Sequence, residues 1–227
     1  NPAEFSDVML GYTDLDTGEK IYVDLPEIAN GSLIPESFEK PGYVYAIGRS
    51  IDGHVGVYRF ENKLMEGTGK LSFRNVEGLA GAPKSVKDSI TAAFNYFMQN
   101  SGKLVERSPL EFDYSLYYND LQSRNVSDEV SVAEVVGLYS ALSNRPVLPS
   151  LVICGRVVMS GETMPVITML DEIFVASANA GAKKILLPES SRSNYMLLSD
   201  KLKKEIAVDF YNTPLEATKL ALGVVLS

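Results

Sequence analysis

The segment from Gly161 to Pro188 constrains the fold more than any other part of this sequence. Apolar residues recur at helical spacing from Val166 to Asn179, which predicts a helix with one buried face. Gly181 then supplies a flexible stop, and the apolar run Lys184–Leu187 follows as a buried strand that Pro188 ends. Between Gly161 and Gly181 the sequence has no Lys, Arg or His, so the predicted helix offers no basic group for catalysis.

Alternating apolar residues predict strands in the first part of the chain. Tyr43–Arg49 and His54–Glu61 flank the turn dipeptide Asp52-Gly53, which is typical of a β-hairpin, and Gly69–Arg74 adds a third strand. From Pro109 onward the predicted strands and helices alternate. The sequence therefore predicts an α+β fold, with a mixed β-sheet, N-terminal hairpins and packed helices.

The other predicted elements follow from the same periodicities. Helices are expected from Pro83 to about Asn100, from Ser127 or Ser131 to Pro146, and over Pro214–Leu222. Further strands are expected over Phe112–Asp120, Leu151–Val158 and Ala207–Tyr211.

Residues 1–40 are the least regular part of the sequence. Asp14–Lys20 is typical of a turn and Ile21–Leu25 of a short strand. We expect residues 1–40 to form an N-terminal extension or strap, and residues 41–227 to form the main domain.

Composition excludes several classes of protein. A net charge of −8 argues against a chain that binds nucleic acid by itself, because phosphate binding depends on clustered Lys and Arg. The single cysteine, Cys154, allows no internal disulfide and favours a reducing compartment, by default the cytoplasm. There is no apolar run near 18 residues, so no membrane span is expected. No phosphate loop is expected, since Leu64 and Leu71 occupy two of its required positions, and no His/Cys/Asp cluster has metal-ligand spacing.

The order of several short motifs resembles the C-terminal proteolytic domain of Lon proteases. The matching motifs are GTGKLSF, KDSITAAFNYF, SNRPV, VICGRV, GETMPV and NAGAKKILLPES. They extend from Gly42 to Leu222, about four-fifths of the chain. The resemblance is closer still to the Lon-related proteins of BREX phage-exclusion systems, through KDSITAAFNYF, SALSNRPV and NAGAKKILLP.

This resemblance implies partners and cofactors outside the chain. Proteins of this kind carry an upstream AAA+ ATPase module and assemble into rings, so a homo-oligomer is expected here. ATP and Mg would belong to the upstream module, and no cofactor is expected in this chain. The BREX members engage double-stranded DNA, which makes DNA a partner of the full-length protein but not of this acidic fragment alone.

Lon proteases use a serine–lysine dyad in which the lysine amine takes the proton of the serine hydroxyl. At the place of the family's Asp-Gly-Pro-Ser-Ala-Gly, this sequence has Asn-Val-Ser-Asp-Glu-Val, so Ser127 is nearest to the nucleophile and Ser131 is its rival. Both serines also suit a structural role, Ser127 as a helix N-cap and Ser131 in a capping box with Glu134. The lysine position, seven residues before Ala180, holds Ile173.

The sequence offers few other catalytic groups. Lys183 and Lys184 lie beyond the predicted helix, Cys154 would need a histidine partner, and the one histidine, His54, belongs to the first hairpin. Asp171, Glu172 and Glu61 are the candidates for paired acids, with a solvated surface as the simpler interpretation.

Two hypotheses follow. In the first, the domain is a degenerate peptidase that acts as an oligomerisation and scaffold module. In the second, it is an active ATP-dependent serine peptidase that uses Ser127 with Lys183 or with a lysine from elsewhere in the ring.

Overall fold

The computed structural model describes residues 10–13, 20–23, 32–73, 83–166 and 168–224. The chain forms two compact units, Asn1–Ser32 and Leu33–Ser227. The boundary lies eight residues before the one expected from the sequence, because Ile34 is buried in the core of the second unit.

The described residues of the first unit include an antiparallel pair of strands. These are β1 (Leu10–Thr13) and β2 (Lys20–Val23), with Leu10 opposite Val23. The strand predicted over Ile21–Leu25 overlaps β2, and its end lies outside the described residues. The predicted turn Asp14–Lys20 also lies outside them except for Lys20, which is the first residue of β2.

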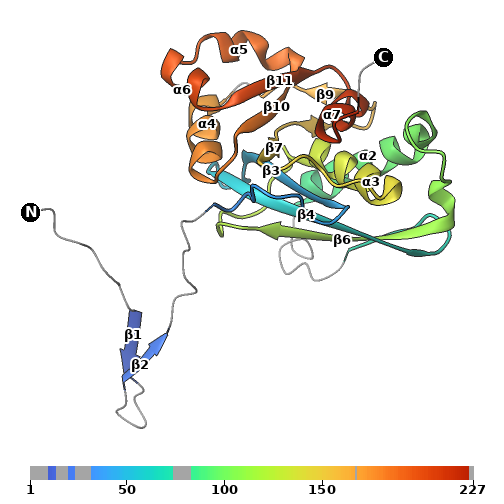
Figure 1. Cartoon of the computed structure of the whole chain (residues 1–227), viewed down its shortest axis with the longest axis horizontal. Helices are drawn as coiled ribbons and strands as arrows, with labels where there is room; N and C mark the ends of the chain where they lie inside the picture. Colours follow the sequence, from blue (N-terminus) through green and yellow to red (C-terminus); the bar gives the residue numbers. More distant parts are fainter. Residues whose placement is uncertain (1–9, 14–19, 24–31, 74–82, 167, 225–227) are drawn as a thin grey trace, which may run out of the picture. The chain divides into compact units, whose positions relative to one another are not determined.

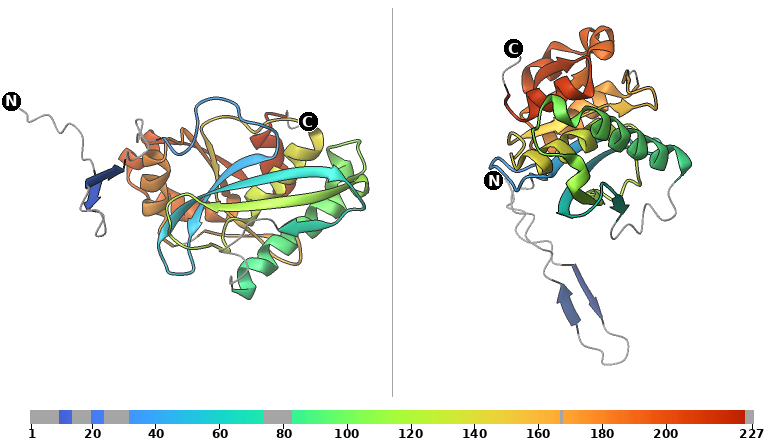
Figure 2. Two further views of the ribbon diagram at one scale, coloured as in Figure 1. Left: turned by 90° about the horizontal axis from the view of Figure 1, so that it is seen from below. Right: turned by 90° about the vertical axis from the view of Figure 1, so that its right-hand side faces the viewer.

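The second unit is built on a mixed seven-stranded sheet (Figure 1). Its order is β11 (Ala207–Tyr211), β10 (Lys184–Pro188), β7 (Leu151–Ile153), β3 (Tyr43–Arg49), β4 (Val55–Glu66), β6 (Phe112–Asp120) and β5 (Leu71–Phe73). The strands β11, β10, β7 and β3 are parallel, β3, β4 and β6 are antiparallel, and β5 is parallel to β6. The two long strands β4 and β6 run side by side, as Figure 1 and the left view of Figure 2 show. The predicted α+β fold with a mixed sheet is confirmed.

Helices cover both faces of this sheet. They are α2 (Lys84–Asn100), α3 (Ser131–Ser143), α4 (Leu170–Asn179), α5 (Arg192–Met196), α6 (Asp200–Glu205) and α7 (Pro214–Ala221). Along β3, Val44 packs with α2, α3 and α7, whereas Ile47 packs with α4. Because successive side chains of a strand point to opposite faces, these two sets of helices lie on opposite sides of the sheet.

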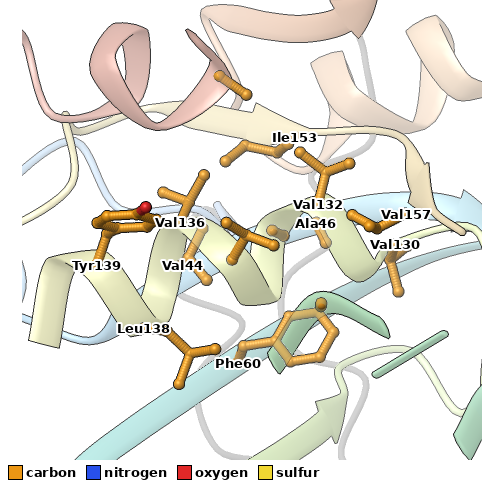
Figure 3. Packing of buried hydrophobic residues seen from close by; sticks show 14 of the residues in the cluster. Val44, Ala46, Phe60, Val130, Val132, Val136, Leu138, Tyr139, Ile153 and Val157 are labelled. Carbon is orange, nitrogen blue, oxygen red and sulfur yellow. The ribbon is translucent and has the colours of Figure 1, made fainter. Parts of the chain in front are cut away.

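Helix α3 is the centre of the larger core. Its residues are buried on every side from Ser131 to Ser140, as expected for a helix that is apolar all round. Figure 3 shows Val132, Val136 and Tyr139 of α3 among side chains of the neighbouring strands, including Val44 and Ile153. Asn144, in the left-handed conformation, ends the helix.

Several predicted elements differ in the structure, and β4 extends to Glu66, beyond the strand predicted over His54–Glu61. The predicted strand Leu151–Val158 is broken after β7, because Gly155 adopts a φ of 143°. The chain then enters a separate small hairpin of β8 (Arg156–Val157) and β9 (Thr163–Met164). The helix predicted from Val166 begins four residues later as α4, because Met169 has a φ of 56° and cannot belong to a right-handed helix.

Candidate functional site

The candidate nucleophile Ser127 lies in the connection between β6 and α3 and is completely buried. Its hydroxyl donates to the Arg49 carbonyl oxygen at 2.7 Å and accepts the Glu129 backbone N–H at 3.0 Å. The Ser127 backbone N–H donates to the hydroxyl of Tyr118 at 2.9 Å, and that hydroxyl donates to the Ser127 carbonyl oxygen at 3.2 Å. Ser127 therefore joins β3, β6 and the start of α3.

The two structural roles predicted for the serines are wrong in detail. Helix α3 begins at Ser131 and its N-cap is Val130, so Ser127 is not the N-cap. The Ser131 hydroxyl accepts the Val157 backbone N–H at 2.9 Å, which ties α3 to β8. The predicted capping box does not form, because the Glu134 side chain bonds to Asn62 of β4.

Backbone N–H groups at the start of α3 bind protein oxygens. The N–H of Glu129 donates to Ser127, that of Val132 to the Gly155 carbonyl oxygen at 3.1 Å, and that of Ala133 to Val130 at 3.2 Å. Gly155 in turn donates to the Glu129 carbonyl oxygen at 3.0 Å. An oxyanion hole needs N–H groups that point at an open position, and these three do not.

The predicted lysine position is part of a hydrophobic core. Ile173 is fully buried, and with Leu170, Phe174 and Ser177 it forms the inner face of α4. Its cluster also contains Cys154. A lysine amine serves as a general base only when its environment supports the neutral form, and here the site holds an aliphatic side chain instead.

The two lysines that follow the predicted helix in sequence form ion pairs with carboxylates. The Lys183 amine lies 2.8 Å from a carboxylate oxygen of Glu36, and the Lys184 amine lies 2.8 Å from one of Asp209. The pair of Lys184 and Asp209 joins the neighbouring strands β10 and β11 at one edge of the sheet. In the described part of the chain, neither lysine amine is bonded to Ser127.

The side chain of Cys154 is completely buried. Burial, and secondarily the charge of Glu129, raises the pKa of its thiol well above the ordinary value, so the thiol stays protonated and unreactive. Its backbone carbonyl oxygen accepts the Tyr211 hydroxyl at 2.6 Å. His54 is exposed beside the hairpin turn, and no bond between it and Cys154 is found in the described part of the chain.

The candidate acids do not form a closely paired set. Asp171 and Glu172 are exposed and, with His54 and Arg124, line an open surface groove of about 460 Å³. Glu61 lies on β4, where it pairs with Arg59 and accepts the Asn119 side-chain amide at 3.0 Å. Over the described ranges, no group of three His, Cys, Asp or Glu side chains is arranged to hold a metal ion.

Sequence reasoning missed the partners that define this site. Arg49, Tyr118 and Gly155 all bond to the connection before α3 or to its first turn. Arg49 is 78 residues from Ser127, and no short-range sequence pattern predicts such a contact.

Within the part of the chain that the structure describes, no helix is long and apolar enough to span a bilayer.

Comparison with known proteins agrees with this architecture. A family model described as the Lon protease (S16) C-terminal proteolytic domain matches residues 53–223. The Lon-like protease BrxL of Escherichia coli O9:H4 (strain HS) is 33% identical over 97% of this chain, and that of Bacillus cereus (strain H3081.97) is 31% identical over 97%. The Lon protease of Halothermothrix orenii is 27% identical over 72% of this chain and 20% of its own length.

The chain spans about a third of the length of the BrxL relatives, 31% and 32% respectively. The matched region contains the whole seven-stranded sheet except β3, together with all the described helices. The chain therefore belongs to the family of the Lon protease C-terminal proteolytic domain.

Proposed function

We propose that this domain is the non-proteolytic C-terminal module of a Lon-related AAA+ protein of the BREX phage-defence type. In this proposal it serves as a scaffold on which a ring of identical subunits assembles. ATP and Mg bind the upstream AAA+ module, DNA binds the full-length protein through regions other than this acidic domain, and the protein works in the cytoplasm.

The observation that carries the proposal is the bonding of Ser127. A serine attacks a peptide only when a base accepts its hydroxyl proton. Here the hydroxyl is completely buried and donates to a backbone carbonyl oxygen, which is not a proton acceptor of that kind. The burial of Ile173 at the expected lysine position supports the same conclusion.

Exposed apolar side chains support self-association. In the β8–β9 hairpin, Met159 of the turn is 70% exposed and Met164 is 45% exposed, and at the end of α5 the adjacent Met196 and Leu197 are 64% and 84% exposed. Exposed apolar side chains that lie next to one another mark interaction surfaces more often than isolated ones do. They give the domain places at which neighbouring subunits could pack.

Peptide cleavage by the full-length protein tests the proposal. With ATP and Mg present, hydrolysis of casein and of a fluorogenic peptide is expected to equal the blank, in the wild type and in S127A and S131A alike. Sedimentation velocity is expected to show a ring-sized particle for the full-length protein and a smaller one after deletion of residues 33–227.

Serine-dependent turnover would overturn the proposal. The decisive pattern would be cleavage by the wild type and by S131A but not by S127A. A urea denaturation curve must accompany the assay, because S127A leaves the Arg49 carbonyl and the Glu129 N–H unpaired and is expected to cost about 1–3 kcal/mol. A folded S127A with unchanged sedimentation makes the cleavage result interpretable.

A further inference from the structure

A carboxyl group lies inside the main hydrophobic core. Glu134 is in the first turn of α3 and has 0% exposure. Asn62 of β4, 72 residues away in sequence, is 3% exposed and donates its side-chain N–H to Glu134 Oε2 at 3.1 Å. Neither residue is a member of the serine–lysine dyad expected from the resemblance, and buried polar groups are usually hydrogen-bonded.

Two oxygen atoms of this pair without a hydrogen-bond partner indicate its protonation state. Among the described residues, Asn62 Oδ1 and Glu134 Oε1 are buried and have no hydrogen-bond partner. If Glu134 is ionised, both oxygen atoms are hydrogen-bond acceptors, so they cannot form a hydrogen bond with each other. A protonated carboxyl group supplies the missing donor, since its O–H can donate to Asn62 Oδ1 while the amide N–H donates to the other carboxyl oxygen.

The helix and the strand approach closely around this pair. A Cβ atom on Gly137, one turn after Glu134, would lie 2.5 Å from Asn62 Nδ2. The Asn62 backbone N–H donates to the Gly42 carbonyl oxygen at 2.9 Å, and the Gly42 N–H donates to the Ser140 hydroxyl at 2.9 Å. The side chains of Glu134 and Asn62 thus sit at a tight contact between α3 and the sheet.

In the described part of the chain, no charged side chain bonds to Glu134. Arg107 and Lys63 border the same surface hollow as Asn62, and the Arg107 guanidinium donates to the Leu142 carbonyl oxygen of α3 at 3.3 Å. The ionisable side chains of this core are tyrosines, on β4, β6, α2, α3 and β11: Tyr58, Tyr114, Tyr118, Tyr96, Tyr139 and Tyr211. Arg156 of β8 forms an ion pair with Asp128, at 3.1 Å. The residues that β3 and α7 contribute to this core are not ionisable; those of β3 are Val44 and Ala46.

Burial raises the pKa of each of these tyrosines above the ordinary value, so none of them ionises near neutral pH. Burial also raises the pKa of Glu134 to about 8, and the hydrogen bond from Asn62 opposes this only in part. Among the described residues of this core, Glu134 is therefore the group that changes charge between weakly acidic and weakly alkaline pH.

We propose that Glu134 and Asn62 form a neutral acid–amide lock between α3 and β4, which holds while Glu134 keeps its proton and weakens when the proton is lost. The lock is a pH-sensitive device of the fold. It is independent of the proposed scaffold function, because it concerns only the internal packing of this domain.

The direction of the pH effect follows from proton binding. In the unfolded chain Glu134 ionises near its ordinary pKa of 4.5, whereas in the folded protein it does so near 8. Between these values the folded state holds one more proton, so the folding equilibrium constant falls up to tenfold for each unit of rising pH. The extra stability is complete below about pH 4.5, and it has been lost by about pH 8.

Urea denaturation of the wild type and of E134Q tests the lock. Glutamine has nearly the same shape and keeps two hydrogen bonds to Asn62, but it does not titrate. Relative to E134Q, the wild-type midpoint is expected to fall steadily from pH 5.5 to pH 8 and to level off above that. The control E172Q changes an exposed acid of α4 and is expected to keep the wild-type pH profile.

A direct measurement decides the matter if E134Q does not fold. The ¹³C NMR shift of the Glu134 side-chain carboxyl carbon in the wild type is expected to report the neutral acid at pH 6 and to titrate near pH 8. An ionised Glu134 at pH 6 would overturn the proposal. Parallel pH profiles of the wild type and a folded E134Q would overturn it as well.

Discussion

Replacement of Gly155 by alanine is expected to destabilise the main unit by more than about 3 kcal/mol. Gly155 has a φ of 143°, a backbone conformation that residues other than glycine rarely adopt. A Cβ atom there would lie 1.9 Å from the Tyr211 hydroxyl, which donates to the Cys154 carbonyl oxygen at 2.6 Å. The substitution therefore breaks a buried hydrogen bond in addition to straining the backbone.

A matched variant separates the two contributions. Gly53 also has a positive φ, 84°, but a Cβ atom there meets nothing within 4 Å. G53A is expected to cost about 1 kcal/mol, from backbone strain alone. Thermal and urea denaturation of the two variants measure the difference, and equal stability of G155A and G53A would contradict the described junction between β7 and β8.

Replacement of Ile173 by lysine is expected to cost roughly 4–7 kcal/mol at neutral pH. Ile173 is fully buried in an apolar cluster with Phe174 and Leu187. A lysine confined there must give up its charge, because burial lowers the pKa of an amine by about 3–5 units. A loss of this size is comparable to the whole stability of many domains.

The pH dependence distinguishes a buried amine from simple disruption. In I173K the unfolded chain would bind one more proton than the folded state, so the variant is expected to gain stability as pH rises from 7 towards about 10. I173M keeps the volume and the apolar character, and it is expected to cost less than about 1.5 kcal/mol with no added pH dependence. Urea midpoints of I173K and I173M that agree at pH 7 would contradict the burial of this position.

Periodicity within single segments was enough to predict much of the fold. The apolar spacing after Pro83 gave helix α2, and the alternation from Phe112 to Asp120 gave strand β6 with the observed bounds. Helix α3 begins at Ser131, one of the two starts expected. In these cases the local preference and the tertiary packing agree.

Tertiary contacts decided the elements that the sequence did not predict. The run Leu151–Val158 is apolar enough for one buried strand, but Gly155 turns the chain so that its N–H and carbonyl reach the start of α3. Met169, in a left-handed conformation, delays α4 although the apolar spacing begins earlier. The partners of Gly155 at the start of α3 are distant in sequence, so the pattern within Leu151–Val158 does not predict them.

In the candidate site, too, some features could be predicted from the local sequence and others depend on distant contacts. The aliphatic residue at the lysine position, Ile173, could be found by counting along the chain. The bonds of Ser127 could not, because Arg49 and Tyr118 reach it from β3 and β6. Glu134 fits the capping-box spacing after Ser131, yet Asn62 outcompetes the helix terminus for its carboxyl group.

Covalent labelling of the full-length protein tests most directly whether this family member has an active serine. A fluorophosphonate reacts with a serine hydroxyl that a nearby base has activated, and the adduct is measured as an increase in intact mass. With ATP and Mg present, and with an active serine peptidase labelled in parallel, no adduct is expected on this protein. A single stoichiometric adduct mapped to Ser127 or Ser131 would contradict the account.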